Sequence, residues 1–303
     1  MGNKSCYDYY LLGVSDYSDI EIGKKRKIIL DKTRQEGKKH IKDFYPLEKD
    51  LQNLPQNSML IKITFRLKKP YTSEGEEEFY LLEWEEKGKS QQKIIENPIV
   101  RDRLLGCPMV RPSTWKGHLR FAAGKVEEID GKKLDEYSRN KVIRRLFGSE
   151  SEDENALKGR LYFFPTFFEE EAEREVITPL KRNTRTPAKG PINLEVIKAG
   201  KKAKFYLLYL PYPEGKDFKE GQIKEDLKFL VNALELLFLT YGFSAKKTSG
   251  FGIIEPKFPE EGQFEMTGIP KDILPRKGKF INFEELKTII DKLCTYLEAD
   301  NGR

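Results

Sequence analysis

The chain has 303 residues, of which 38% are hydrophobic and 12% aromatic, and this composition excludes an intrinsically disordered protein. No apolar run reaches the ~20 residues that a membrane-spanning helix needs. The net charge of +6 arises from 55 basic and 49 acidic residues that gather in separate runs, a pattern that favours a local basic groove and a polyanionic partner.

Cysteine usage and the first residues indicate the cellular compartment. Cys6, Cys107 and Cys294 are far apart and odd in number, so the sequence predicts neither a disulfide framework nor a zinc site. The N-terminus carries no apolar signal core. We therefore expect a cytoplasmic protein with no membrane partner.

The first part of the chain is predicted to be an extension over residues 1–58. Its charged stretch 19–41 has the pattern of a helix, and Pro46 and Pro55 indicate a linker. Residues 59–67 then alternate apolar and polar side chains, as a half-buried strand does.

The later elements alternate between helices and strands. In chain order, the sequence predicts an insertion over about 71–112 without a sustained period, a helix starting at Ser113, a helix ending at Gly148, a strand over 159–167, an insertion over about 169–198, a strand over 202–210, a helix over 223–240, a closing strand over 252–258 and a helix over 284–297. This order indicates an antiparallel α+β sheet with a βαββαβ core over 59–260, followed by a C-terminal helical appendage over 261–303.

The helix that starts at Ser113 has the features of an anion site. Pro112 ends the extended chain before it, which leaves the Ser113 hydroxyl to cap the helix. Lys116 and Arg120 lie one turn apart on one face, and Gly117 between them permits a close approach to the backbone. Free N–H groups beside two cations predict a bound anion, and an ordinary capped helix is the alternative.

A glycine-rich segment over 242–252 is the second candidate anion site. It is not a P-loop, because a helix precedes it and a strand is predicted to follow. Its backbone N–H groups are candidates for cradling a phosphate, and a flexible turn is the alternative. The candidate residues are Lys246, Lys247, Ser249, Gly250 and Gly252.

Four motifs in series resemble the RAMP superfamily, which provides backbone subunits of type III CRISPR effector complexes. They are Asn97-Pro-Ile-Val-Arg-Asp102 followed by Gly106-Cys-Pro-Met-Val110, then Ser113-Thr-Trp-Lys-Gly-His-Leu-Arg120, then Leu146-Phe-Gly148 with Gly159-Arg-Leu-Tyr-Phe163, and finally Lys247-Thr-Ser-Gly-Phe-Gly252. The resemblance covers about residues 59 to 258.

The resemblance implies an RRM-like (ferredoxin-like) core that polymerises along a CRISPR guide RNA, with target RNA and neighbouring effector subunits as further partners. By position, Ser113, Lys116 and Arg120 would hold guide phosphates beside the Lys246–Gly252 loop. The basic loop over 181–189, which contains the candidate RNA-binding residues Arg182 and Arg185, falls where the family has a thumb hairpin.

The resemblance leaves catalysis open. Catalytic members carry an Asp just before the Asn/Ser-Pro turn for metal-dependent cleavage of target RNA, and this chain has Glu96 there. A carboxylate suits Mg²⁺ or Mn²⁺, but Glu is one methylene longer than Asp, and such positions tolerate little displacement. The subunit is therefore either a binding scaffold or, through Glu96, a metal-dependent endoribonuclease.

A stand-alone RRM-like binder of single-stranded RNA is a third hypothesis. Aromatic side chains on its strands would stack on bases, and core packing explains the same residues equally well. The candidates are Tyr162, Phe163, Phe164 and Phe167. Nothing in the sequence brings His40 and His118 to one cleft, so a two-imidazole ribonuclease is not favoured.

Overall fold

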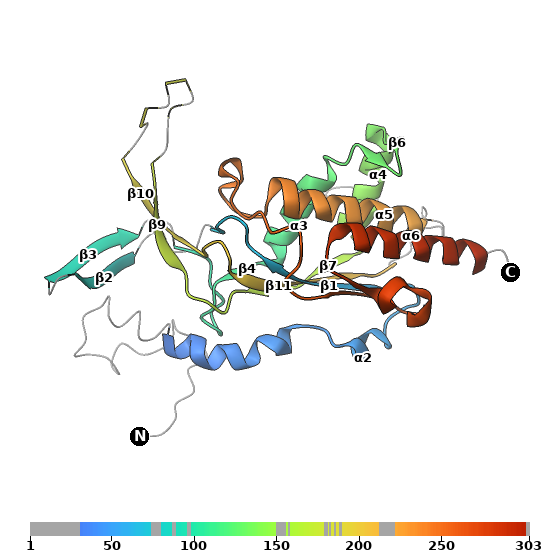
Figure 1. Ribbon diagram of the computed structural model, residues 1–303, viewed down its shortest axis with the longest axis horizontal. Helices are drawn as coiled ribbons and strands as arrows, with labels where there is room; N and C mark the ends of the chain where they lie inside the picture. The colour runs from blue at the N-terminus through green and yellow to red at the C-terminus, as the bar shows by residue number, and fades with distance from the viewer. Residues whose placement is uncertain are drawn as a thin grey trace.

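An antiparallel five-stranded sheet forms the centre of the fold (Figure 1). The computed structural model describes residues 31–73, 80–86, 89–95, 98–149, 156, 158–178, 181, 183–184, 186–187, 190–211 and 222–300. The sheet order is β13-β12-β1-β11-β7. Its strands are β1 (Met59–Arg66), β7 (Leu161–Phe163), β11 (Lys202–Tyr209), β12 (Gly262–Met266) and β13 (Lys279–Phe280).

Helices cover one side of the sheet (Figure 1). They are α3 (Pro112–Ala123), α4 (Glu136–Phe147), α5 (Gln222–Glu235), the π-helix η3 (Leu236–Tyr241) that continues α5, and α6 (Phe283–Asp300). Ile61, Ile63 and Phe65 of β1 are fully buried beneath them, as the alternation predicted. Within the described part of the chain, no helix is both long and apolar enough to cross a membrane.

Trp115 of α3 is the centre of the aromatic core. Its ring lies 4.8 Å from that of Phe205 on β11 and 4.5 Å from that of Phe243 in the glycine-rich segment. The indole N–H donates to Thr166 Oγ1 at 3.0 Å, so its one polar group is satisfied although the residue is fully buried. Trp115 thus fixes α3 against the sheet and against the glycine-rich segment.

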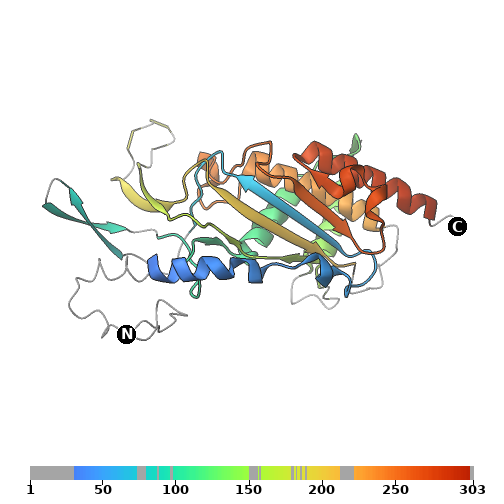
Figure 2. The same ribbon diagram turned by 60° about the horizontal axis from the view of Figure 1, so that its bottom comes forward.

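Two hairpins project from the same end of the molecule (Figures 1 and 2). They are β2 (Tyr80–Glu86) with β3 (Lys89–Ile95), and β9 (Glu173–Ile177) with β10 (Ile192–Val196). The sequence predicted an insertion over about 71–112 but indicated no strands in it, so β2 and β3 were missed. The β3 sequence Lys-Ser-Gln-Gln-Lys-Ile-Ile has no apolar alternation, so only its pairing with β2 reveals the strand.

The predicted closing strand over 252–258 is also wrong. Within that segment the described pairing is a single bridge between Ile254 and Leu67, and Pro256 lacks the N–H that a ladder needs. The strand that closes the sheet is β12, which pairs with β1. Residues 261–303, predicted as an appendage, therefore supply β12 and β13 to the sheet.

The N-terminal segment lies on the side of the sheet away from α5 and α6 (Figures 1 and 2). It comprises a helix over 31–37, the 3-10 helix η2 (Lys38–Phe44) and α2 (Glu48–Leu51). The Phe44 ring is 5.2 Å from that of Phe167, and the Tyr45 ring stacks on Tyr206 at 4.2 Å. This part of the predicted extension is therefore packed against the core, although the sequence predicted a linker there.

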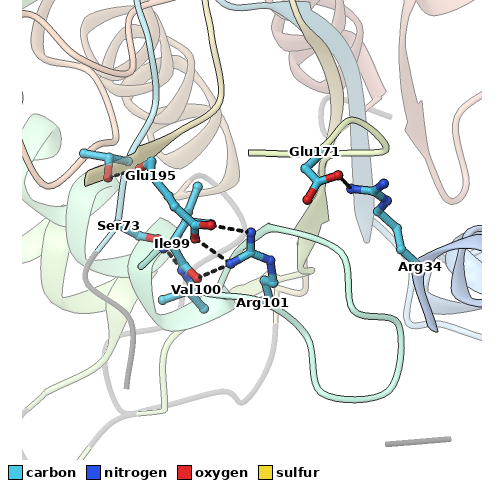
Figure 3. A network of polar contacts seen from close by, with 8 residues as sticks. Arg34, Ser73, Ile99, Val100, Arg101, Glu171 and Glu195 are labelled. Atoms are coloured by element: carbon cyan, nitrogen blue, oxygen red, sulfur yellow. Dashed lines mark hydrogen bonds and ion pairs between the residues drawn. The ribbon is translucent and has the colours of Figure 1, made fainter. Parts of the chain in front are cut away.

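A buried ion pair joins the bases of the two insertions (Figure 3). Arg101 binds Glu195 of β10 through two nitrogens, at 2.6 and 3.0 Å, and both side chains are at least 92% buried. Glu195 also accepts the N–H of Ile99 at 3.0 Å, and Ser73 Oγ accepts that of Val100 at 2.9 Å. Nearby, Arg34 of the N-terminal helix pairs with Glu171 at 3.0 Å.

A second buried network ties α5 to α4 and to the sheet. The fully buried Asp226 carboxylate accepts from Arg145 at 2.6 Å, from Arg160 at 2.7 Å and from the Tyr209 hydroxyl at 2.9 Å. Such a network tolerates the loss of a partner poorly, because the remaining charges stay buried without compensation.

We expect Asp226→Ala to lower the free energy of unfolding by about 3–5 kcal/mol, because it leaves two buried guanidinium groups without their carboxylate. Urea denaturation of the purified chain measures this. Glu225→Ala is the matched control: Glu225 also binds Arg145, at 2.7 Å, but its side chain is 44% exposed. We expect Glu225→Ala to lower the free energy of unfolding by less than about 1 kcal/mol. Equal losses in the two variants would contradict the assignment.

Candidate nucleic-acid interface

Helix α3 has one buried face and one exposed face. Trp115, Leu119, Ala122 and Ala123 are buried. The exposed residues recur at helical spacing, and they are Ser113, Lys116, Gly117, Arg120 and Phe121. A Cβ added at Gly117 would meet nothing within 4 Å, so the backbone is open to a partner there. The structure thus places the predicted α3 residues together on one solvent-facing stripe.

The start of α3 differs from the prediction. Arg111, in extended conformation, is the N-cap; Pro112 is the first helical residue; and the cap has no side-chain hydrogen bond. Ser113 is therefore not the capping residue. Proline is preferred at the first helical position, because its φ suits the helix and its missing N–H would have no intrahelical partner. The Ser113 side chain is consequently exposed at the second helical position.

Glycines shape the 242–252 segment because its two ends cross closely. Gly242 has φ +72°, and a Cβ there would lie 2.4 Å from the carbonyl oxygen of Phe251. Gly252 has φ +79°, and its Cβ would lie 2.7 Å from the Ser244 nitrogen. The Gly252 end is also bonded to the chain after β1, since the Gly252 N–H donates to Pro70 O at 2.7 Å. These glycines are required by the fold itself.

Backbone N–H groups that the sequence predicted to bind a phosphate form hydrogen bonds within the segment instead. The N–H of Ser249 donates to Lys246 O at 3.0 Å, and that of Gly250 donates to Lys247 O at 2.8 Å. They form the 3-10 turn η4 (Lys247–Ser249). The turn thus offers an anion its lysine side chains and the exposed Ser249, rather than a nest of amides. Gly250, at φ +78° with open space around it, forms the end of the turn.

The turn and the α3 stripe meet at Phe121. The Lys247 ammonium lies 4.2 Å from the centre of the Phe121 ring, and Tyr241 packs edge-on to the same ring at 5.3 Å. Burial and the nearby Lys247 charge lower the pKa of His118 to about 4, so this imidazole is neutral at pH 7. Lys247 of the glycine-rich turn therefore extends the cationic stripe of Lys116 and Arg120.

Sequence analysis missed Phe121 as part of this surface. It is 44% exposed, although it continues an apolar run with Ala122 and Ala123. Its position four residues after Gly117 was the available signal, because that spacing places both residues on one helical face.

Several motif residues have structural roles. Arg101 is held in the ion pair with Glu195, and the Asp102 carboxylate accepts the N–H groups of Leu104 and Leu105 at 2.9 and 2.8 Å. The aromatic candidates are also mostly packed: Phe167 is 3% exposed beneath Phe44, and Phe163 contacts the main core.

Other predicted site residues lie elsewhere. Glu96, Arg182 and Arg185 lie outside the described residues. His40, which bonds Asp43 at 3.2 Å, belongs to the N-terminal segment across the sheet from α3. Among the described residues, no three His, Cys, Asp or Glu side chains gather as metal ligands.

Comparisons with known proteins agree with the sequence motifs. The CRISPR system Cms endoribonuclease Csm3 of Streptococcus thermophilus is 29% identical over 169 residues, which cover 52% of this chain and 73% of the relative. A solved type III-B Cmr-beta complex bound to cognate target RNA contains a chain with a TM-score of 0.44 and 15% identity, over 85% of this chain and 81% of that one. A chain in the solved structure of a Csm3–Csm4 subcomplex from a type III-A complex has a TM-score of 0.42 and 17% identity, over 78% of this chain and 96% of that one. The model of the RAMP superfamily matches residues 88–255, more than half of the sequence, and the chain therefore belongs to the RAMP superfamily.

Proposed function

We propose that this protein is a guide-RNA-binding backbone subunit of a type III CRISPR effector complex that acts in antiviral defence. The observation that carries the proposal is the convergence of Lys116 and Arg120 on α3 with Lys247, the neighbour of Lys246, on the adjoining turn. Cations that follow one exposed helix face suit a phosphate backbone, which carries no base-specific information. A backbone subunit must hold guides of any sequence, so this kind of contact is the appropriate one.

The strand order supports an RRM-like (ferredoxin-like) core. If β1, β7, β11 and β12 are the four strands of a βαββαβ unit, their order in the sheet is 4-1-3-2, with α3 and α5 as the two crossover helices. The β2–β3 and β9–β10 hairpins are then insertions after the first and second core strands. We assign the thumb role to β9–β10, whose connecting residues include Arg182 and Arg185.

Target RNA and neighbouring effector subunits are the further partners that we propose. The relatives support this assignment by their names, since one solved complex holds cognate target RNA and another pairs Csm3 with Csm4. An RNA-guided complex of this kind acts where transcripts are found, so the cytoplasm is the compartment that we infer.

We expect Lys116→Glu/Arg120→Glu to abolish binding of guide RNA, because the variant replaces two cations by carboxylates that repel phosphates. The test is to purify the chain with the products of its neighbouring genes and to sequence the RNA that accompanies it. The native protein should bring uniform short RNAs with repeat-derived ends, and the variant should bring little RNA. For single-stranded RNA in vitro, we expect the affinity to fall at least about tenfold. The slope of log K against log salt concentration should become shallower by about 1.4, or ~0.7 for each lost phosphate contact.

Lys132→Glu/Lys133→Glu is the matched control, because both lysines are exposed and lie on a separate element, the β5–β6 hairpin (Glu128–Ile129 and Lys132–Lys133). Gly117→Gln separates RNA contact from helix stability. Replacing this exposed glycine should stabilise α3 by up to about 1 kcal/mol, yet its side chain would block the approach of a phosphate backbone. Native RNA content in both the Lys116/Arg120 variant and Gly117→Gln would overturn the assignment.

His118 reports on whether a phosphate binds beside Lys247. In the free protein its pKa is about 4, below the usual 6.5, so the unfolded state binds its proton more tightly. Above pH 6.5 His118 is neutral in both states and does not lower the free energy of unfolding. As the pH falls towards 4, protonation favours the unfolded state, and the free energy of unfolding decreases. We expect bound RNA to raise this pKa by about one unit or more, because a phosphate opposes the effect of Lys247. NMR titration measures it, with His40→Gln assigning the signals; an unchanged pKa would contradict a phosphate there.

Metal-dependent cleavage of target RNA is the second candidate function. The observation that favours it is the endoribonuclease activity named for the Csm3 relative. Glu96 would hold Mg²⁺ or Mn²⁺ together with phosphate oxygens, since the described residues supply no ligand cluster of their own. A bound divalent ion would supply charge stabilisation to the transferring phosphate.

We expect Glu96→Gln, in the assembled complex, to abolish target cleavage while target binding persists. Glu96→Asp should retain or increase cleavage, because it restores the shorter carboxylate of catalytic family members. The assay follows labelled target RNA with Mg²⁺ or Mn²⁺, and Glu128→Gln, at an exposed position, serves as the control. Unchanged cleavage by Glu96→Gln would leave this subunit as a scaffold only.

A further inference from the structure

A second basic surface lies across the sheet from α3. Between η2 and strands β1, β11 and β12 is a groove of about 320 Å³, near the lower end of the range for ligand sites. Its lysines are Lys38, Lys39, Lys42, Lys62 and Lys204. Its carboxylates are Glu169 and Glu265, and Glu265 accepts from Gln263 at 2.6 Å and from Lys271 at 3.1 Å. Positive charge therefore predominates, and we call this surface the sheet groove.

The strand register aligns polar groups along the floor of the sheet groove. Lys62 on β1 is directly opposite Tyr206 on β11 and directly opposite Gln263 on β12. Lys204 precedes Tyr206 by two residues, so its side chain stands on the same face. A cation, an aromatic ring and an amide thus lie side by side across three strands.

A stacked pair of tyrosines lines the sheet groove. The Tyr45 and Tyr206 rings are nearly parallel, with 12° between their planes, and Lys62 Nζ lies 5.8 Å from the Tyr206 ring centre. Burial raises the pKa of both phenols, so both remain uncharged. Tyr45 covers the ring of Tyr206, which is 7% exposed, so the half-buried Tyr45 ring is the aromatic surface that lies among the lysines.

We propose that the sheet groove binds a segment of single-stranded RNA. Lysines that bind phosphates beside an aromatic surface for bases are the features of such sites. Lys62 and Lys204 bind phosphates in this arrangement, and a base packs against Tyr45, the half-buried ring of the pair. An acidic peptide would match the lysines but would make no use of the aromatic pair. The site is separate from the α3 stripe, so the protein contacts RNA on both sides of its sheet.

The test uses the full chain carrying Lys116→Glu/Arg120→Glu, so that the α3 stripe does not contribute. The probe is a fluorescein-labelled 12-nucleotide polyuridine, and binding is followed by anisotropy against salt concentration. We expect measurable binding that Lys62→Glu/Lys204→Glu weakens at least about tenfold, with the salt slope lower by about 1.4 for two phosphate contacts. Lys38→Glu/Lys42→Glu, at exposed positions that do not affect the sheet, should also weaken it.

Lys132→Glu/Lys133→Glu in the same background is the matched control, and it should bind like its parent. A 4-thiouridine probe should crosslink to Tyr45 or to its neighbours. Three results would overturn the proposal: no polyuridine binding in the parent, equal losses in the groove variants and the control, or displacement of the RNA by oligoglutamate at lower concentration than by unlabelled RNA. Loss of guide RNA in the Lys116/Arg120 variant is scored separately, so either assignment can fail alone.

Discussion

The burial of Trp115 is the constraint on which the RNA-facing surface depends. Its indole fills the space between α3, the sheet and Phe243, and its N–H is satisfied by Thr166. Because this residue faces inwards, helical geometry turns Lys116 and Arg120 outwards. The same contact with Phe243 holds the glycine-rich segment against α3, so Lys247 arrives beside Phe121. One buried ring thus positions cations from two separate parts of the chain.

The Arg101–Glu195 pair has an analogous role for the insertions. It joins the residues that follow the β2–β3 hairpin to a strand of the β9–β10 hairpin, and nearly all of it is removed from water. Separating a buried pair would leave two uncompensated charges. The Arg101–Glu195 pair therefore couples the bases of the two hairpins to each other. The motif arginine serves this coupling rather than an RNA contact.

The sequence predicted those elements that bury one face along their whole length, such as β1, β11 and α5. In such elements the apolar residues recur at the regular spacing of a strand or a helix, which can be read locally. It also predicted the Lys116–Arg120 stripe, which follows from helical spacing alone. It did not predict β12, a five-residue strand recognised by its pairing with β1. Nor could it show that the amides of Ser249 and Gly250 bond internally or that Lys247 reaches Phe121. These features depend on contacts between distant segments, which leave no local pattern.

The position of β1 between β11 and β12 has a consequence for biosynthesis. β12 leaves the ribosome about 200 residues after β1, as the numbering shows. At ~5–20 residues per second, one edge of β1 waits roughly 10–40 s for its partner. Its unpaired backbone groups are open to other strands throughout that interval. This edge of β1 therefore stays unpaired until residues 262–266 are made, and a message truncated before them would yield a chain with an open sheet edge.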